Sequence, residues 1–100
     1  MTQLTKSHIA SGQPVLLHFY AHWCAQSQQM KPVWQALQER VGERALVLHL
    51  DIDTHPDLAQ EYEIATVPTS ILFLNGYPIW RKSGFITLPA LTSELNYHLP

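Results

Sequence analysis

Residues 15–32, VLLHFYAHWCAQSQQMKP, decide the fold of this 100-residue chain. The apolar run at 15–20 predicts a central β-strand that is covered on both faces. A short turn follows and leads through the only cysteine, Cys24, into an amphipathic helical pattern. Unpaired backbone N–H groups and the positive end of the helix dipole lie at such a helix start, and they favour a thiolate over a thiol. We therefore expect the chemistry of the protein at Cys24.

The helix that begins at Cys24 is expected to pack on a sheet and to bend. Apolar residues recur at spacings of four and three between positions 30 and 41, which places them on one face of a helix. Pro32 lacks the N–H group that would bond to the carbonyl of Gln28. The sequence therefore predicts a kink one to two turns past Cys24.

Shorter patterns predict the other elements. A weak helical pattern at 4–10 puts Leu4, His8 and Ile9 on one side, and Asn75-Gly76 predicts a tight β-hairpin. Further strands are expected at 45–51, 69–74 and 77–82, a short helix at 57–62 and a last helix at 88–99. This order predicts an α/β fold over residues 1–100, a single domain with a mixed sheet of about four strands flanked by helices.

Composition narrows the class of protein. With 46% hydrophobic and 14% charged residues and a net charge of -2, the chain resembles an ordinary globular protein with no basic surface for nucleic acid or membranes. One cysteine makes no internal disulfide, and residues 1–11 lack the pattern of a signal peptide, so we expect a cytoplasmic protein. His18, His22 and Cys24 lack the spacing of a strong metal site, and neither a metal nor a cofactor is expected.

Several motifs together resemble the thioredoxin family. FYAHWCAQS at 19–27 is similar to the family's F-W-A-x-W-C-G-P-C, and Pro32 to its helix-kinking proline. DIDTHP, VPT, NG and Gly84 follow in the family's order as far as the C-terminus. The resemblance implies a thioredoxin-like fold, a cis bond before Pro68 and thiol–disulfide exchange with client proteins. It also implies that the family's first strand is missing, which would leave the strand at 45–51 as an open edge and the protein as a monomer or a weak edge-paired homodimer.

The departures from the family pattern bear directly on function. Ser27 stands where the family has its second cysteine, and Ala25-Gln26 replaces Gly-Pro. His18 occupies the position of the family's buried aspartate, and His49 that of its companion lysine. The resemblance implies that His18 lies beneath the thiol, where it is either a catalytic proton acceptor or a hydrogen-bonded core residue.

The chemistry of a lone thiol is limited by the missing partner. A thiolate at Cys24 can attack a client disulfide, but the Ser27 hydroxyl cannot resolve the resulting mixed disulfide. Glutathione or another external thiol could release it, a second client thiol could rearrange it, or it could persist. Ser27 either donates a hydrogen bond to the thiolate or is only a polar residue near a helix start. The first interpretation is therefore an oxidoreductase or isomerase whose activity is limited by the missing second cysteine.

A second interpretation is a non-catalytic adaptor or chaperone-like domain that keeps the peptide groove. In both interpretations Trp23, Val67, Pro68 and Gly84 form the surface that contacts a client, with the backbone of Val67 pairing with an extended segment. The sequence also leaves open whether Ser27 is native or an engineered replacement for a cysteine, in which case the native protein would be a dithiol oxidoreductase.

Overall fold

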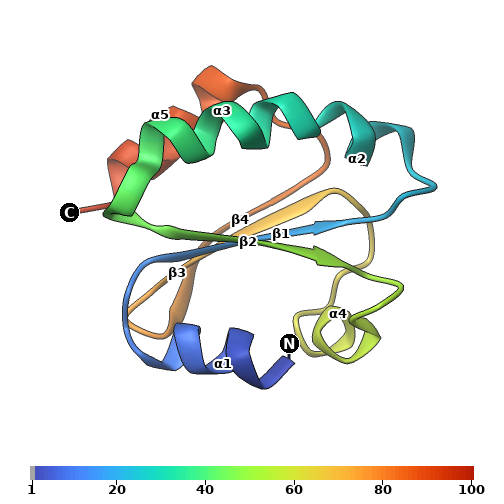
Figure 1. Ribbon diagram of the computed structural model, residues 1–100, viewed down its shortest axis with the longest axis horizontal. Coiled ribbons are helices and arrows are strands. Elements are labelled where there is room, and N and C mark those ends of the chain that lie inside the picture. Colours follow the sequence, from blue (N-terminus) through green and yellow to red (C-terminus); the bar gives the residue numbers. More distant parts are fainter. Residues whose placement is uncertain (1) are drawn as a thin grey trace.

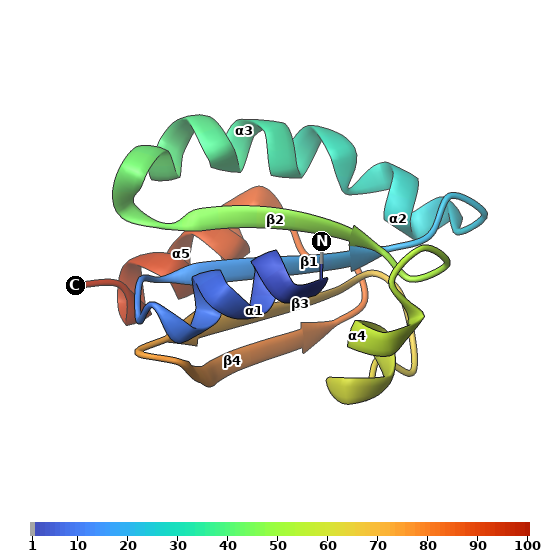
Figure 2. The same cartoon turned by 60° about the horizontal axis from the view of Figure 1, so that its bottom comes forward.

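Helices cover both faces of a four-stranded sheet in the computed structural model, which describes residues 2–100 (Figure 1). The elements are α1 (Thr2–Ala10), β1 (Val15–Tyr20), α2 (Ala25–Gln29), α3 (Lys31–Val41), the 3-10 turn η1 (Gly42–Arg44), β2 (Leu46–Asp51), α4 (Pro56–Glu61), β3 (Thr69–Leu74), β4 (Tyr77–Ser83) and α5 (Leu88–His98). Helices α2, α3 and α5 lie on one face, and α1 and α4 on the other, as the turned view in Figure 2 also shows. The predicted α/β class and mixed sheet are confirmed.

The sheet has the order β2-β1-β3-β4, so β1 is a central strand as predicted. It runs parallel to β2 and antiparallel to β3, and β3 pairs antiparallel with β4. The last pair is the predicted hairpin: Asn75 and Gly76 have φ values of 53° and 84°, which is the conformation that a type I′ turn requires at both central positions.

Alternate residues of β1 enter two separate apolar cores. Leu16 packs with Trp34 and Leu37 of α3 and with the buried face of α5. Its neighbours Val15, Leu17 and Phe19 face α1 and α4 on the opposite side. Because side chains alternate along a strand, both faces of β1 must be apolar, and Val15 to Phe19 are all buried. The prediction of a strand covered on both faces is therefore confirmed.

The predicted bend after Cys24 is a complete break between two helices. α2 ends at Gln29 and α3 begins at Lys31, with Met30 as the residue between them and Pro32 in the first turn of α3. Proline is tolerated there because the first N–H groups of a helix have no partner within it. The predicted buried stripe of α3 is confirmed, since Trp34 and Leu37 are buried along one side.

The predicted apolar side of α1 is right at Ile9 and wrong at Leu4. Leu4 is 54% exposed, whereas Thr5 and Ile9 are buried. These two lie four residues apart and so share one face of the helix. Boundaries elsewhere shift by one residue or so: β2 begins at Leu46 because the chain first makes the turn η1.

Strand β2 is one edge of the sheet formed by residues 2–100, and β4 is the other. Two hydrogen bonds join the ends of β2 to the β1 segment: Leu46 N–H donates to Pro14 O, just before β1, at 2.9 Å, and Ile52 N–H, just after β2, donates to Tyr20 O at 3.0 Å. In a parallel ladder, alternate residues of one strand direct their backbone groups to the same neighbour. The residues between them therefore direct theirs away from it.

No helix in the described part of the chain is long and apolar enough to cross a membrane.

Candidate functional site

Strand pairing brings four chain segments to one end of the sheet. β1 and β2 are parallel, and Tyr20 at the end of one is paired with Asp51 at the end of the other. β3 begins at the same end, where Thr69 pairs with both Phe19 and Ser83. The segments that follow β1, β2 and β4 and the one that precedes β3 therefore converge there, and Cys24 lies among them.

The Cys24 thiol lies half exposed against the turn that precedes β3. Its Sγ donates to the carbonyl oxygen of Val67 at 3.4 Å. The peptide bond between Val67 and Pro68 is cis. Gly84 N–H donates to Pro68 O at 2.7 Å, which fixes the end of β4 beside this turn. Cys24, Val67, Pro68 and Gly84, expected together from the sequence, are thus linked by two hydrogen bonds.

Several hydrogen-bond donors lower the pKa of the Cys24 thiol. The largest cause is the hydroxyl of Ser27, followed by the backbone N–H groups of Ser27 and Gln26. Partial desolvation opposes them and raises the pKa. Cys24 is the N-cap of α2, so these N–H groups are the ones that a helix start leaves without partners within the helix. Because α2 has only five residues, local donors matter more here than the dipole of a long helix.

Ser27 is held where its hydroxyl can serve two groups. The residue is buried, and its Oγ accepts from Ala21 N–H at 3.3 Å, which ties α2 to the turn after β1. The same oxygen carries the proton that stabilises the Cys24 thiolate. A hydroxyl has one donor and two acceptor sites, so both interactions are compatible.

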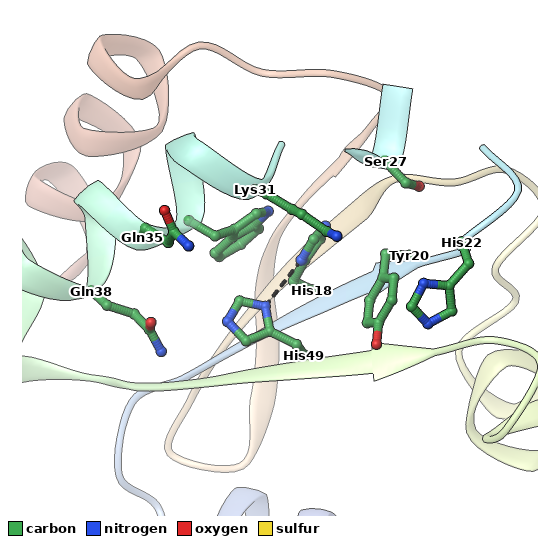
Figure 3. Close-up of a pocket in the computed structure, with 9 residues that line it drawn as sticks. His18, Tyr20, His22, Ser27, Lys31, Gln35, Gln38 and His49 are labelled. Carbon is green, nitrogen blue, oxygen red and sulfur yellow. Dashed lines mark hydrogen bonds between the residues drawn. The ribbon is translucent and has the colours of Figure 1, made fainter. Parts of the chain in front are cut away.

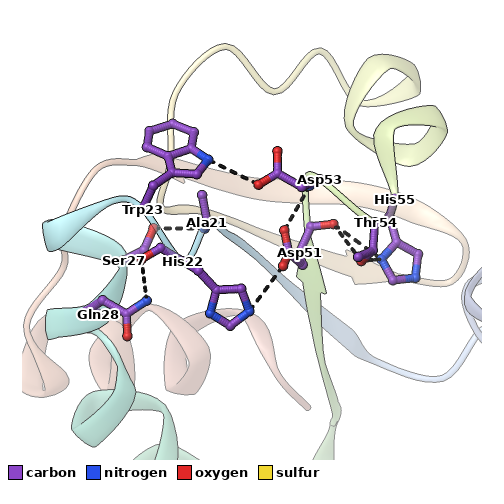
Figure 4. Close-up of polar contacts among 9 residues, drawn as sticks. All are labelled: Ala21, His22, Trp23, Ser27, Gln28, Asp51, Asp53, Thr54 and His55. Atoms are coloured by element: carbon purple, nitrogen blue, oxygen red, sulfur yellow. Dashed lines mark hydrogen bonds and ion pairs between the residues drawn. The ribbon is translucent and has the colours of Figure 1, made fainter.

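A second network holds the exposed Trp23 and was not foreseen from the sequence (Figure 4). Trp23 is 69% exposed, and its Nε1 donates to Asp53 Oδ2 at 3.1 Å. Asp53 N–H in turn donates to Asp51 Oδ1 at 2.8 Å, and His22 Nε2 lies 3.2 Å from Asp51 Oδ2. The D-x-D segment that ends β2 carried a usable signal, because strand ends collect at one edge of a parallel pair.

His18 and His49 face each other on neighbouring strands, as expected. Their Nδ1 atoms lie 3.1 Å apart, so one ring donates and the other accepts. His18 is 3% exposed and stacks on Trp34 with ring centroids 4.2 Å apart. Burial is the largest cause that lowers the pKa of His18 to about 3, and desolvation also lowers that of His49. Both rings are therefore neutral near pH 7.

A pocket of about 390 Å³ opens beside this pair (Figure 3). It lies between α3 and β2, and we call it the α3–β2 pocket. Ser27 is one of its lining residues, and Cys24, whose Sγ contacts Val67, is not. No three His, Cys, Asp or Glu residues among positions 2–100 are arranged to hold a metal ion. The lining residues are His18, Tyr20, His22, Ser27, Lys31, Trp34, Gln35, Gln38 and His49.

The structure thus divides the predicted site residues into two groups. Trp23, Val67, Pro68 and Gly84 lie around the exposed side of Cys24. His18 lines the α3–β2 pocket.

Comparison with known proteins agrees with this geometry. The family model described as Thioredoxin matches residues 2–97. The chain belongs to the thioredoxin family. Among solved structures, mitochondrial thioredoxin 3 from Saccharomyces cerevisiae, in its oxidized form, is similar with a TM-score of 0.87 and 25% sequence identity, over 96% of this chain and 89% of that one.

Relatives in the thioredoxin family differ in how much of their length this chain spans. A thioredoxin from Mycobacterium tuberculosis is 38% identical over 95 residues, which make up 92% of this chain and 79% of that protein. Thioredoxin Y, chloroplastic, from rice is 40% identical over 85% of this chain, but the match spans only 51% of the rice protein. The chain covers 20% of a bifunctional thioredoxin reductase/thioredoxin from Mycobacterium leprae, to which it is 34% identical.

Replacing Ser27 with alanine is expected to raise the Cys24 pKa, because the largest cause of its depression is lost. The pH midpoint of the alkylation rate with iodoacetamide should therefore move upward, toward that of an ordinary thiol. Gln26→Ala is the matched control, since it leaves the backbone N–H of residue 26 in place. An unchanged midpoint in Ser27→Ala would show that the hydroxyl does not tune the thiol.

The depressed pKa of His18 predicts how stability depends on pH. Its folded pKa of about 3 lies below the ordinary value of 6.5, so between these values the unfolded chain binds more protons. The free energy of unfolding should therefore fall, by up to a few kcal/mol, as pH decreases through this window. Urea titrations of His18→Leu should show a shallower dependence than wild type, whereas His8→Gln, outside the pair, should not. Parallel curves for wild type and His18→Leu would contradict the assignment.

Proposed function

We propose that this thioredoxin-family protein performs thiol–disulfide exchange with client proteins through Cys24 alone. The observation that carries the proposal is the position of the thiol: half exposed, 3.4 Å from the Val67 carbonyl, with its pKa lowered by Ser27. Thiol–disulfide exchange on protein substrates is the chemistry of the family. A lowered pKa increases the thiolate fraction, which is the attacking species.

The exchange proceeds without net oxidation. The Cys24 thiolate attacks one sulfur of a client disulfide, a new S–S bond forms to Cys24, and the other client sulfur leaves as a thiolate. A second thiolate, from glutathione or from the same client, then attacks the client sulfur of the mixed disulfide. Cys24 leaves as a thiolate and the attacking sulfur takes its place in the disulfide. Ser27 takes no covalent part in either step.

The rim around the thiol supports binding of an extended client segment. Deprotonation of Cys24 removes its hydrogen bond to Val67 O, which leaves that carbonyl free to accept from a client N–H. Trp23 presents an exposed indole whose orientation is fixed by Asp53, and aromatic anchors of this kind are enriched at protein contacts. Pro68 and Gly84 complete the contact surface.

We also propose that His18 accepts the proton that the external thiol loses when it becomes the thiolate that attacks the mixed disulfide. With a pKa of about 3, the His18 ring is neutral at physiological pH and holds this proton only briefly before water takes it. Because His18 Nδ1 is hydrogen-bonded to His49, Nε2 is the nitrogen of the His18 ring that is free to accept this proton. If His18 serves in this way, His18→Leu slows release of the mixed disulfide but leaves capture unchanged.

A fluorescent peptide with a disulfide tests the mechanism. Wild-type protein should capture the peptide covalently at Cys24 and release it only when glutathione is added. Ser27→Cys should release it without added thiol, because an internal thiolate acts at an effective concentration of about millimolar or more. Cys24→Ala is the control. Two results together would favour the adaptor function, which the exposed Trp23 also fits. In that case wild type would not capture the peptide covalently, and Cys24→Ala would bind it as tightly as wild type does.

We also propose that β2 forms a weak homodimer through its open edge. Leu46 and Ile52 direct their N–H groups to β1, so by alternation Val47 and His49 direct theirs outward. An antiparallel pair centred on Leu48 matches Val47 with His49 of the second copy. No lysine or proline interrupts Leu46–Asp51 to discourage such pairing.

Light scattering across a wide concentration range checks the dimer. Wild type should show a rising mean mass at high concentration. Val47→Pro removes one outward N–H and should remain monomeric, whereas Val47→Ala keeps the N–H and should still associate. Monomer alone at every wild-type concentration would rule the dimer out.

A further inference from the structure

We propose that the α3–β2 pocket binds a small planar organic anion, such as an aromatic carboxylate. The pocket measures about 390 Å³, which is within the range of small-molecule sites in proteins. Neither Cys24 nor any residue of the client rim lines it. The assignment does not depend on exchange chemistry at Cys24.

The walls suit a flat ring. His18 and Trp34 are stacked with an angle of 21° between their planes. His49 stands edge-on to both, at 88° and with centroids 5.3 Å and 5.4 Å away. Tyr20 continues the aromatic surface from His18, at a centroid distance of 5.7 Å. Because His18 and Trp34 stack on each other and are only 3% and 2% exposed, a planar ligand would contact mainly the more exposed rings of Tyr20 and His49. Aromatic rings favour such edge-to-face and offset neighbours.

The rim favours a negative charge. Lys31, Gln35 and Gln38 follow one another along the side of α3 that borders the pocket (Figure 3), and all three are exposed. The Lys31 ammonium forms no ion pair with the described residues, and in Figure 3 its side chain points from α3 toward His18. No carboxylate lines the pocket. Cages that bind ammonium groups are also aromatic, but the lysine makes this one unfavourable for a cation.

Two buried ring nitrogens lack a partner. Neither His18 Nε2 nor Trp34 Nε1 has a hydrogen-bond partner among the described residues, although the two side chains are 3% and 2% exposed. Buried polar atoms of this kind are rare in folded proteins, and each calls for an explanation. Trp34 Nε1 can only donate, and His18 Nε2 also donates when His49 supplies the proton of the Nδ1 pair. Both atoms are covered by neighbouring side chains, so an acceptor atom of an anionic ligand would satisfy them after a small movement of the pocket wall.

Titration of 2-naphthoate into isotope-labelled protein, followed by amide and imidazole NMR shifts, tests the site. The matched cation 2-naphthyltrimethylammonium has the same ring and the opposite charge. Naphthoate should shift the signals of His18, His49 and Trp34 with saturation, and the cation should bind more weakly or not at all. Absence of saturable shifts at these residues, or tighter binding of the cation, would overturn the proposal.

Variants separate the pocket from general surface binding. Lys31→Gln should weaken naphthoate by about threefold or more, and Lys31→Arg should retain it. Lys82→Gln removes an equally exposed charge from β4 and should have no effect. Trp34→Phe keeps an aromatic ring but loses the indole N–H, and should also weaken binding.

Cys24→Ser is the control for the exchange site. It should bind naphthoate as wild type does, so a failed exchange assay and a failed pocket assay are distinguishable. Equal affinities in Lys31→Gln and Lys82→Gln would contradict the site.

Discussion

The placement of β1 between a parallel and an antiparallel neighbour is the constraint on which the site depends. Parallel pairing brings the end of β2 to the end of β1, and antiparallel pairing brings the start of β3 to the same place. Cys24 is therefore within hydrogen-bonding distance of Val67, 43 residues away in the chain. Burial of both faces of β1 in two cores fixes this register, because a slip by one residue would exchange the two faces.

Serine at position 27 bears directly on the exchange that we propose for Cys24. Its hydroxyl lowers the Cys24 pKa and also anchors α2 to Ala21. A sulfur of lower pKa is a somewhat weaker nucleophile but a better leaving group. Cys24 should therefore be displaced readily when an external thiolate attacks the client sulfur. The features that make the thiolate stable thus also favour reversibility, which suits a protein that has no internal thiol to complete the reaction.

Local patterns in the sequence were enough to predict most of the fold. The apolar run of β1, the Asn75-Gly76 turn and the stripe of α3 each depend on neighbours in the chain, and all agree with the structure. The side of α1 was predicted only in part: Ile9 is buried, but the polar Thr5 is buried as well while Leu4 is exposed, a result of packing that hydrophobicity alone does not encode. The pocket was not foreseen for a similar reason: α3 contributes exposed polar residues, and only tertiary structure places them over a histidine pair from two strands.

The departures from the family pattern at positions 18 and 49 offset one another electrostatically. In that pattern an aspartate occupies the place of His18 and a lysine that of His49, so a pair of opposite charges is replaced by two rings. Burial lowers the pKa of His18, and desolvation lowers that of His49, so both rings are neutral near pH 7. The exchange therefore alters the net charge beside the site very little. Ser27 is the departure that acts on the sulfur itself, because its hydroxyl donates to the thiolate and is the largest cause of the lowered Cys24 pKa.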